Sequence, residues 1–294
     1  MKKIGTHNGG FHTDDVFGTA LLKSIYPDVE IIRTRDNNIL ATCDIVYDVG
    51  GGKYDHHQID KKVRFNDIPY SSFGLLWEDF AFEYLDKFFP GLNNFEKNQV
   101  KRDLDDQFIQ GIDAIDNGID VILEQRARLY SITDIIRSFQ PHWADKEKNM
   151  DNCFMEAVLF AERILYNKAQ QLSDSFYAKR MVQKALNKRK NKKILILKSF
   201  VPWKKALLEL DKDEEVEFVV YPSSDGTFHT QVVPKTLGVY GARVDLPKQW
   251  AGLRDEELSK VTKVPGCIFC HTSQFLAVHQ TMHGAIRLAE KAIS

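Results

Sequence analysis

The sequence has few cysteines and no long hydrophobic run. Four Cys residues in 294 are too few and too scattered for a disulfide framework, so we expect a reducing compartment. No stretch approaches the roughly 20 consecutive apolar residues that cross a membrane. The first residues lead directly into a short strand and a polar motif, without the apolar segment of a secretory signal. We therefore expect a cytoplasmic protein that does not bind membranes.

An excess of one charge is also missing. The chain has 40 Lys and Arg against 41 Asp and Glu, a formal net charge of -1. Without an overall basic field, a nucleic-acid-binding protein would need a local basic strip. Residues 179–193 hold eight Lys or Arg. This stretch fits either a solvated helix end with a linker or a strip that contacts a phosphate backbone.

The order of apolar runs predicts an α/β fold. Short runs at residues 2–6, 30–34 and 45–49 are typical of strands, and apolar residues at helical spacing in 14–26 separate the first two. Strand, helix, strand and strand with short links predict a doubly wound, mainly parallel sheet.

The length of 294 residues suits two domains. Residues 151–190 contain no Gly or Pro and carry an apolar stripe, which predicts one or two long helices that lead to a second domain. A turn at 222–226 separates two strand-like runs in the second half. We therefore expect a first domain at residues 1–192 and a smaller α+β domain at residues 193–294.

Histidine and aspartate gather after the first predicted strand. His7 and His12 flank a Gly-Gly pair, and Asp14 and Asp15 follow at the start of the predicted helix. Carboxylates are also favourable at a helix start without any ligand, so capping is the alternative interpretation. The two glycines would let both histidines converge on one metal ion.

A second cluster follows the third predicted strand. Asp48 precedes three glycines and could either form a turn or bridge two ions. In the triplet Asp55-His56-His57, adjacent histidines in a loop do not easily point the same way. One can therefore bind an ion while the other faces substrate as a general acid or phosphate contact. Asp55 could orient a ring, and a solvated polar loop is the alternative.

Two further acids could supply the last ligand. Asp113 and Asp116 are three residues apart and share one face of a predicted helix. Acidic residues are common near helix ends without any function. Asp116 is slightly favoured because Asn117-Gly118 places it at the end of the helix.

The C-terminal segment holds further candidates. Cys267 and Cys270 have the spacing of a zinc motif, but the local pattern predicts a buried strand in which free Cys acts as a small hydrophobic residue. His271, His279 and His283 follow. His279 lies near the start of the last predicted helix, where backbone amides could hold a phosphate, so we predict a substrate contact there.

The mixture of imidazole and carboxylate indicates the chemistry. These ligands suit a divalent first-row ion, and enough of them are present for two ions. The imidazoles favour Mn²⁺, with Mg²⁺ as the alternative. The hypothesis is a two-metal hydrolase that cleaves phosphate esters.

These motifs resemble the DHH phosphoesterase superfamily, which includes RecJ-like nucleases and family II inorganic pyrophosphatases. Within it, the chain is most similar to the branch named after melanocyte proliferating gene 1. The resemblance extends over nearly the whole chain, at residues 6–9, 11–12, 33–36, 43–46, 48–51, 54–58, 113–114, 116–118, 202–204, 252–255 and 265–269.

The resemblance implies a catalytic metal-binding first domain and a substrate-binding second domain. It implies a metal-dependent exonuclease that degrades RNA or short oligonucleotides from the 3′ end. The implied metal ligands are His7, His12, Asp14, Asp48, His56 and Asp116. His57, Asp55 and Asp15 are the catalytic candidates, and His279, His271 and Arg254 are the substrate-binding candidates.

The chain departs from this pattern near its C-terminus. Ala277-Val278 replace a Gly-Gly pair before His279, and Gln280 replaces an Arg that would clamp a phosphate. Two other functions therefore stay open, a phosphatase for pyrophosphate or short nucleotides and a non-catalytic, metal-stabilised regulatory protein. A homo-oligomer is compatible with the sequence.

Overall fold

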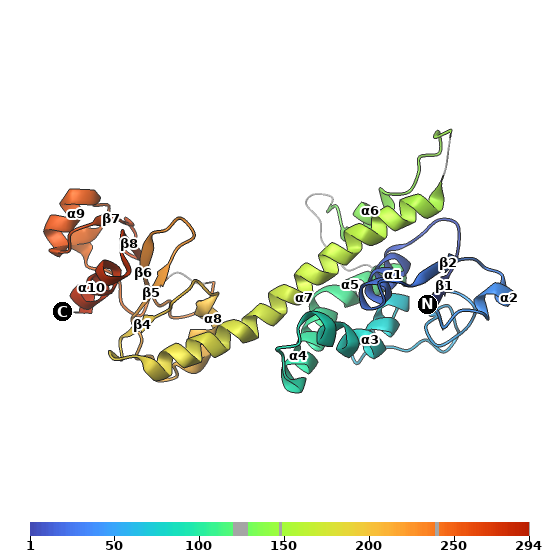
Figure 1. The fold of residues 1–294 in the computed structure, drawn as a ribbon, viewed down its shortest axis with the longest axis horizontal. Coiled ribbons are helices and arrows are strands. Elements are labelled where there is room, and N and C mark those ends of the chain that lie inside the picture. The colour runs from blue at the N-terminus through green and yellow to red at the C-terminus, as the bar shows by residue number, and fades with distance from the viewer. Residues whose placement is uncertain (120–128, 147–148, 239–240, 294) are drawn as a thin grey trace. The chain divides into compact units, whose positions relative to one another are not determined.

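The computed structural model describes residues 1–119, 129–146, 149–238 and 241–293. The chain divides into two compact units, Met1–Ser173 and Asp174–Ser294 (Figure 1). The division falls inside the long helix α7 (Met150–Lys188), which agrees with the predicted helix at residues 151–190. The predicted boundary at residues 192 and 193 lies beyond the end of α7. The boundary is earlier because Ala178, Val182 and Leu186 of α7 pack into the core of the second unit.

The first unit contains a three-stranded parallel sheet in the order β2-β1-β3. Its strands are β1 (Lys3–Thr6), β2 (Glu30–Arg33) and β3 (Ile45–Val46). The central strand β1 is almost entirely buried, as expected for a parallel strand with neighbours on both edges. The predicted parallel pairing is therefore present in this unit, whereas the doubly wound arrangement stays a prediction.

Helix α1 (Thr13–Ile25) follows β1 and packs against α3 (Ser72–Phe88). The ring centroids of Phe17 and Phe73 are 5.4 Å apart. Gly18 permits this close approach, because a Cβ there would lie 2.9 Å from a methyl group of Leu76. The other helices of this part are α2 (Asn37–Leu40), α4 (Asn94–Leu104), a π-helical turn (Asp105–Ile109), α5 (Gln110–Asp116) and α6 (Ile132–Arg137).

The second unit is built on a five-stranded sheet in the order β4-β5-β6-β8-β7. Only β4 and β5 pair parallel, and the other pairs are antiparallel. The strands are β4 (Ile194–Ile196), β5 (Phe218–Pro222), β6 (Phe228–Val232), β7 (Cys267–Cys270) and β8 (Leu276–His279). The helices are α8 (Trp203–Leu210), a 3-10 turn (Lys248–Trp250), α9 (Asp255–Thr262) and α10 (Met282–Ile293).

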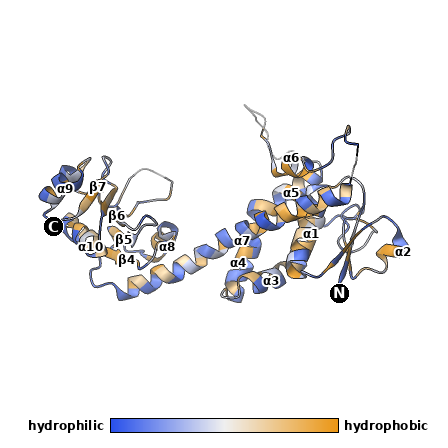
Figure 2. Cartoon of the chain, turned by 45° about the horizontal axis from the view of Figure 1, so that its top comes forward, coloured by the Kyte–Doolittle hydropathy of each residue, from blue (hydrophilic) through white to orange (hydrophobic). Residues whose placement is uncertain are grey.

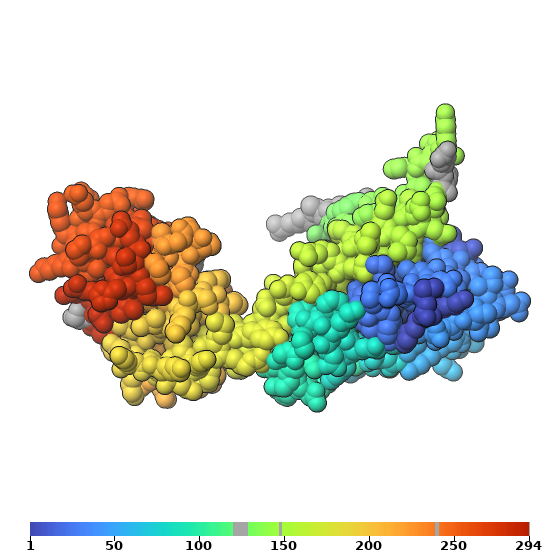
Figure 3. Space-filling model, in the orientation of Figure 1, coloured from blue at the N-terminus to red at the C-terminus, as the bar shows by residue number. Residues whose placement is uncertain are grey.

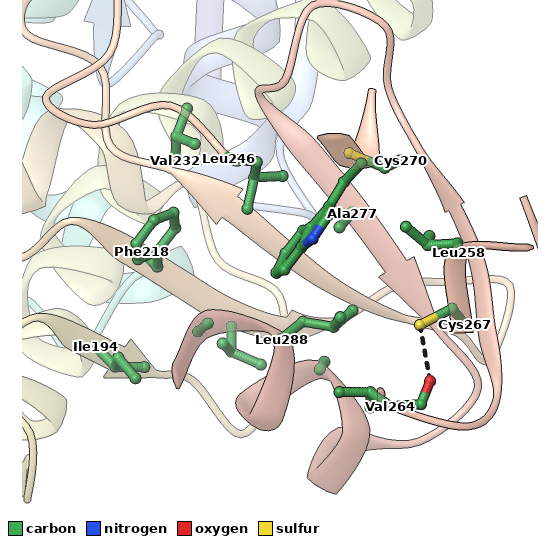
Figure 4. Packing of buried hydrophobic residues seen from close by; sticks show 14 residues of the cluster. Ile194, Phe218, Val232, Leu246, Leu258, Val264, Cys267, Cys270, Ala277 and Leu288 are labelled. Carbon is green, nitrogen blue, oxygen red and sulfur yellow. Dashed lines mark hydrogen bonds between the residues drawn. The ribbon is translucent and has the colours of Figure 1, made fainter. Parts of the chain in front are cut away.

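Two apolar cores lie on the two faces of this mixed sheet. On one face, the last turns of α7 and helix α8 pack against Leu195 and Val219. On the other face, α10 packs against Ile194 and Phe218 (Figure 4). Hydrophobic and hydrophilic residues alternate along α7, so the helix can pack one face against a core and expose the other to solvent (Figure 2).

Cys267 and Cys270 belong to the core under α10 and are 2% and 1% exposed. The thiol of Cys267 donates to the carbonyl of Val264 at 3.1 Å, which is the dashed line in Figure 4. This agrees with the prediction of a buried strand. In the part of the chain that the structure describes, no helix is long and apolar enough to span a bilayer.

Candidate metal centre

The predicted clusters converge in the first unit, at the carboxyl ends of β1 and β3. His7 directly follows β1, and Asp48 comes two residues after β3. Loops and helix ends supply the other side chains. Three groups have potential ligand atoms within 4.8 Å of one another: His7, Asp15 and Asp48; Asp48, His56 and His57; and His12, Asp14 and Asp116.

Asp48 joins two of these groups. One carboxylate oxygen lies 3.1 Å from Nε2 of His7, and the other lies 3.2 Å from Nε2 of His56. Asp48 has a φ of 59°, a left-handed conformation that costs energy in a residue with a Cβ. The following Gly50 and Gly51 also have positive φ, so the chain turns sharply at this point. The conformation directs the Asp48 carboxylate between the two imidazoles.

The start of α1 brings two buried carboxylates to the site. Asp15 accepts a hydrogen bond from the backbone N–H of His12 at 2.9 Å, which caps the helix. Its other oxygen lies 3.2 Å from Nε2 of His7. Asp14 lies 3.7 Å from Nε2 of His56 and accepts from the N–H of Ser72 at 3.3 Å. Capping and site formation therefore coexist at this helix start.

The structure places Asp116, and not Asp113, in the cluster. Asp116 lies 3.2 Å from Nε2 of His56 and 3.9 Å from Nδ1 of His12. Asp113 instead binds the guanidinium of Arg64 at 2.7 Å and accepts from the hydroxyl of Ser71 at 2.5 Å. Asp113 is therefore part of the packing of the unit.

His57 points outward from the cluster. Its side chain is 61% exposed, and its Nδ1 lies 2.9 Å from a carboxylate oxygen of Asp55. Asp55 is held by the N–H of Gly51 at 2.7 Å and by the N–H of His57 at 3.1 Å. Burial would raise the pKa of Asp55, but these donors outweigh it and lower the pKa. Asp55 thus orients the His57 ring. Such an orienting role for Asp55 was expected from the sequence.

Burial and like charge set the protonation of the cluster. Burial, together with Asp48 and Asp116, raises the pKa of Asp14 well above its usual value, and burial also raises the pKa of Asp15. Burial favours neutral His7, but Asp15 and Asp48 outweigh it and raise its pKa to about 10. Burial likewise opposes the charge on His56, and Asp48 raises its pKa. For Asp48, the two histidines overcome burial and lower the pKa.

The residues present fit a divalent cation. Asp14 Oδ1, Asp15 Oδ2 and both carboxylate oxygens of Asp48 are buried, and none of them makes a hydrogen bond of good geometry with the described residues. Buried carboxylate oxygens are costly unless positive charge balances them. The donor set is imidazole nitrogen and carboxylate oxygen, which suits a first-row divalent ion.

The C-terminal candidates lie in the second unit and differ in accessibility. His279 is 2% exposed. Its Nε2 lies 2.8 Å from the carbonyl of Pro265, and its Nδ1 accepts from the N–H of Thr281 at 2.9 Å. Both ring nitrogens are therefore engaged, and the contact between His279 and substrate stays a prediction. Gly284 packs on the ring so closely that a Cβ would lie 1.9 Å from it.

The other two candidates are more accessible and flank one aromatic ring. The guanidinium of Arg254 lies 5.5 Å from the ring centroid of Phe269. The His271 ring lies 6.5 Å from that ring and 4.3 Å from Phe275. His271 also accepts from the N–H of Ser273 through Nδ1.

A cavity of about 150 Å³ lies beside His12 and Asp116, and Arg137, which was not among the predicted site residues, contributes to its lining. Arg137 ends helix α6, whose start is capped reciprocally by Ser131 and Asp134. The Ser-x-x-Asp spacing of this capping box was the available signal for the helix. Nothing in the sequence indicated that its last residue would lie beside the cluster.

Comparison with known proteins identifies the family. A model of the uncharacterised protein family UPF0160, also named MYG1_exonuc, matches residues 3–293. A MYG1 protein of Schizosaccharomyces pombe is 32% identical, covering 100% of this chain and 98% of that protein. The human MYG1 exonuclease is 32% identical, covering 99% and 86%.

A crystal structure of RecJ with Mn²⁺ from Thermus thermophilus aligns with 99% of this chain and 52% of the RecJ chain, at 11% identity and a TM-score of 0.28. That likeness is too low to support an argument. The match to the family model and the full-length relatives do not depend on it. The chain belongs to the MYG1 family, UPF0160.

Proposed function

We propose that this protein is a metal-dependent phosphoesterase that removes nucleotides from the 3′ end of RNA, with two divalent ions, Mn²⁺ preferred. One observation carries the proposal: Asp48 lies between His7 and His56, with both carboxylate oxygens buried and neither making a hydrogen bond of good geometry with the described residues. A carboxylate in that position suits two cations. The name of the human relative, an exonuclease with which this chain aligns over 86% of its length, supports the choice of reaction.

The proposed ligands surround Asp48. His7 contacts one oxygen of Asp48, and its ring centroid lies 6.1 Å from that of His12. His12 groups with Asp14 and Asp116, and His56 lies within 3.7 Å of both of these carboxylates. Asp15 lies 3.2 Å from His7, against 3.1 Å for Asp48, and it caps the helix that carries Asp14. We therefore assign Asp15 to positioning His7.

Bound divalent ions would polarise the scissile phosphate and neutralise the charge that develops on it. The protein's own groups supply the rest of the chemistry. Asp55 holds Nδ1 of His57, so its Nε2 is the ring atom free to give a proton to the leaving oxygen or to bind a phosphate. Arg137, which lines the cavity beside His12 and Asp116, provides a guanidinium for a phosphate group.

The test uses the full-length protein and a single-stranded RNA labelled at one end or the other. With Mn²⁺ and a 5′ label, we expect a ladder of products shortened from the 3′ end. His56→Ala should lower the rate by about 10²–10³-fold, the loss typical of removing a catalytic electrostatic group. His283→Ala is the control, because His283 is exposed in the other unit. Near-normal hydrolysis by His56→Ala would contradict the assignment.

A phosphatase for pyrophosphate or short nucleotides is the second candidate. The formal net charge of -1 favours it, because a long polyanion is not attracted by the protein as a whole. Salt separates the two functions. Binding of RNA through several phosphates should weaken steeply as salt rises, whereas turnover of pyrophosphate should change little.

A further inference from the structure

The sheet of the second unit has an open edge at β4. In the strand order, β4 has only β5 as a neighbour. The N–H of Leu197 donates to the carbonyl of Val220 at 2.8 Å, and the carbonyl of Lys193 accepts from the N–H of Phe218 at 3.0 Å. Because successive residues of a strand direct their peptide groups to opposite sides, the N–H and C=O of Ile196 point to the open edge.

A groove of about 650 Å³ runs along this edge. Helix α7 covers one face of the sheet and α10 covers the other, and the surfaces of these two helices adjoin in Figure 3. The apolar lining is aliphatic: Met181, Ala185, Ile194, Ile196, Leu197 and Ile286. Ile196 is 41% exposed and Met181 is 40% exposed, so part of this lining faces solvent.

Positive charge surrounds the groove. Lys184, Lys188, Lys190 and Lys198 line it and have no carboxylate partner among the described residues. Arg189 also lines it and pairs with Glu215. The lining that the structure describes includes one acidic residue, Glu290. The groove therefore combines an aliphatic surface, an open strand edge and an excess of cations.

We propose that this groove binds an acidic, extended peptide of a partner protein, which adds a strand to β4. The peptide backbone would pair with the N–H and C=O of Ile196. Since successive side chains of a strand point to opposite faces, carboxylates on one face would meet Lys184 and Lys188 of α7, while apolar residues on the other face would contact Ile286 of α10. Three of the eight cations at residues 179–193, Lys184, Lys188 and Lys190, would thereby bind carboxylates of the peptide.

Two other occupants fit less well. A single-stranded nucleic acid would bind the lysines, but among the described residues that line the groove there is no aromatic side chain on which bases could stack. A second copy of this chain, paired through β4, would bring two sets of the same lysines together, and their repulsion opposes such a dimer.

The test measures the binding of labelled probe peptides to the full-length protein. The first probe alternates glutamate and valine and is blocked at both ends. Its controls are the same peptide with lysine for glutamate, the same peptide with alternate amides N-methylated, and a uridine oligonucleotide. We expect the acidic probe to bind and to be released near 1 M salt, where the Debye length is ~3 Å. The lysine and N-methylated peptides should bind at least about tenfold more weakly, the latter because it cannot pair as a strand.

Variants locate the site. Lys184→Glu with Lys188→Glu should weaken the acidic probe by at least about tenfold, whereas Lys212→Glu with Lys248→Glu, two exposed lysines outside the groove, should not. Ile196→Pro removes only an N–H that points to the open edge, a position where an edge strand tolerates proline. It should abolish binding that Ile196→Val retains. Equal binding of the N-methylated peptide, preference for the oligonucleotide, or full binding by the double variant would each overturn the proposal.

Discussion

Asp113 and Asp116 lie within one turn of α5, yet their carboxylates belong to separate networks. Asp116 lies 3.2 Å from His56 in the metal cluster. Asp113 is fully buried against Arg64, which also binds Asp105. The π-helical turn before α5 inserts an extra residue per turn, a feature often found next to functional sites.

This separation predicts opposite effects for two matched substitutions. Asp116→Asn should weaken Mn²⁺ binding and change unfolding in urea little without metal, because Asp116 is partly exposed and its ion contacts among the described residues are to His12 and His56 of the cluster. Asp113→Asn should lower the free energy of unfolding by about 1–3 kcal/mol, because it removes a charge partner from a buried guanidinium. Its metal binding should persist. If Asp113→Asn lost metal binding at urea concentrations where it is still folded, the separate roles of Asp113 and Asp116 would be contradicted.

Gly74 in α3 allows Asp113 to approach that helix. A Cβ at Gly74 would lie 2.0 Å from Oδ2 of Asp113 and 2.9 Å from Tyr70. Gly74→Ala should therefore destabilise the first unit by about 1–3 kcal/mol, the usual cost of overpacking. Gly111→Ala is the control within α5, since no atom lies within 4 Å of its added Cβ. It should be neutral or stabilise the helix by about 0.5–1 kcal/mol. Thermal unfolding without metal measures both.

The sequence allowed us to predict that some site residues would come together, namely those that follow neighbouring parallel strands. His7 comes directly after β1 and Asp48 two residues after the neighbouring strand β3, and carboxyl ends of parallel strands meet at one edge of a sheet. Asp55-His56-His57 could be predicted from its adjacent histidines after an Asp and from the family resemblance, whereas the pairing of Tyr54 with Tyr47 that returns this loop to the site is seen only in the structure. The choice of Asp116 depended on an Asn-Gly stop signal and agreed with the structure in position.

Contacts between distant segments could not be predicted. Arg64 and Ser71 reach Asp113 from 49 and 42 residues away, and no local pattern encodes that meeting. His279 was placed at a helix start that could hold phosphate, but it is the last residue of β8 and is enclosed by Pro265 and Gly284. Packing in three dimensions decided both outcomes.

His57 provides a test that separates proton transfer from metal binding. His57→Asn keeps a polar side chain but cannot transfer a proton near neutral pH. We expect kcat to fall by about 10²–10⁴-fold, the usual contribution of a general acid or base, with unchanged Mn²⁺ stoichiometry. Asp55→Asn should lower kcat less, because it only frees the ring to rotate. If His57→Asn changes KM alone, His57 binds the phosphate and does not transfer a proton.

His7 makes metal binding depend on pH. Its contacts with Asp15 and Asp48 outweigh burial and raise its pKa to about 10 in the metal-free protein, so at neutral pH it carries a proton that a ligand must lose. Mn²⁺ affinity should therefore rise by about tenfold per pH unit between about pH 7 and about pH 9. Calorimetry in buffers with different ionisation enthalpies should detect the released proton.

The same shift sets the stability of the metal-free protein in the opposite direction. Because the folded pKa of His7 exceeds the unfolded value of 6.5, the charged ring stabilises the fold fully below pH 6.5, and this contribution is lost as pH rises through about 10. Without metal, the free energy of unfolding should fall over that range, and His7→Gln should flatten the decline. With Mn²⁺ bound, the alkaline decline should disappear, because the ion replaces the proton as the partner of Asp48. An unchanged alkaline decline in the metal-loaded protein would show that His7 is not a ligand.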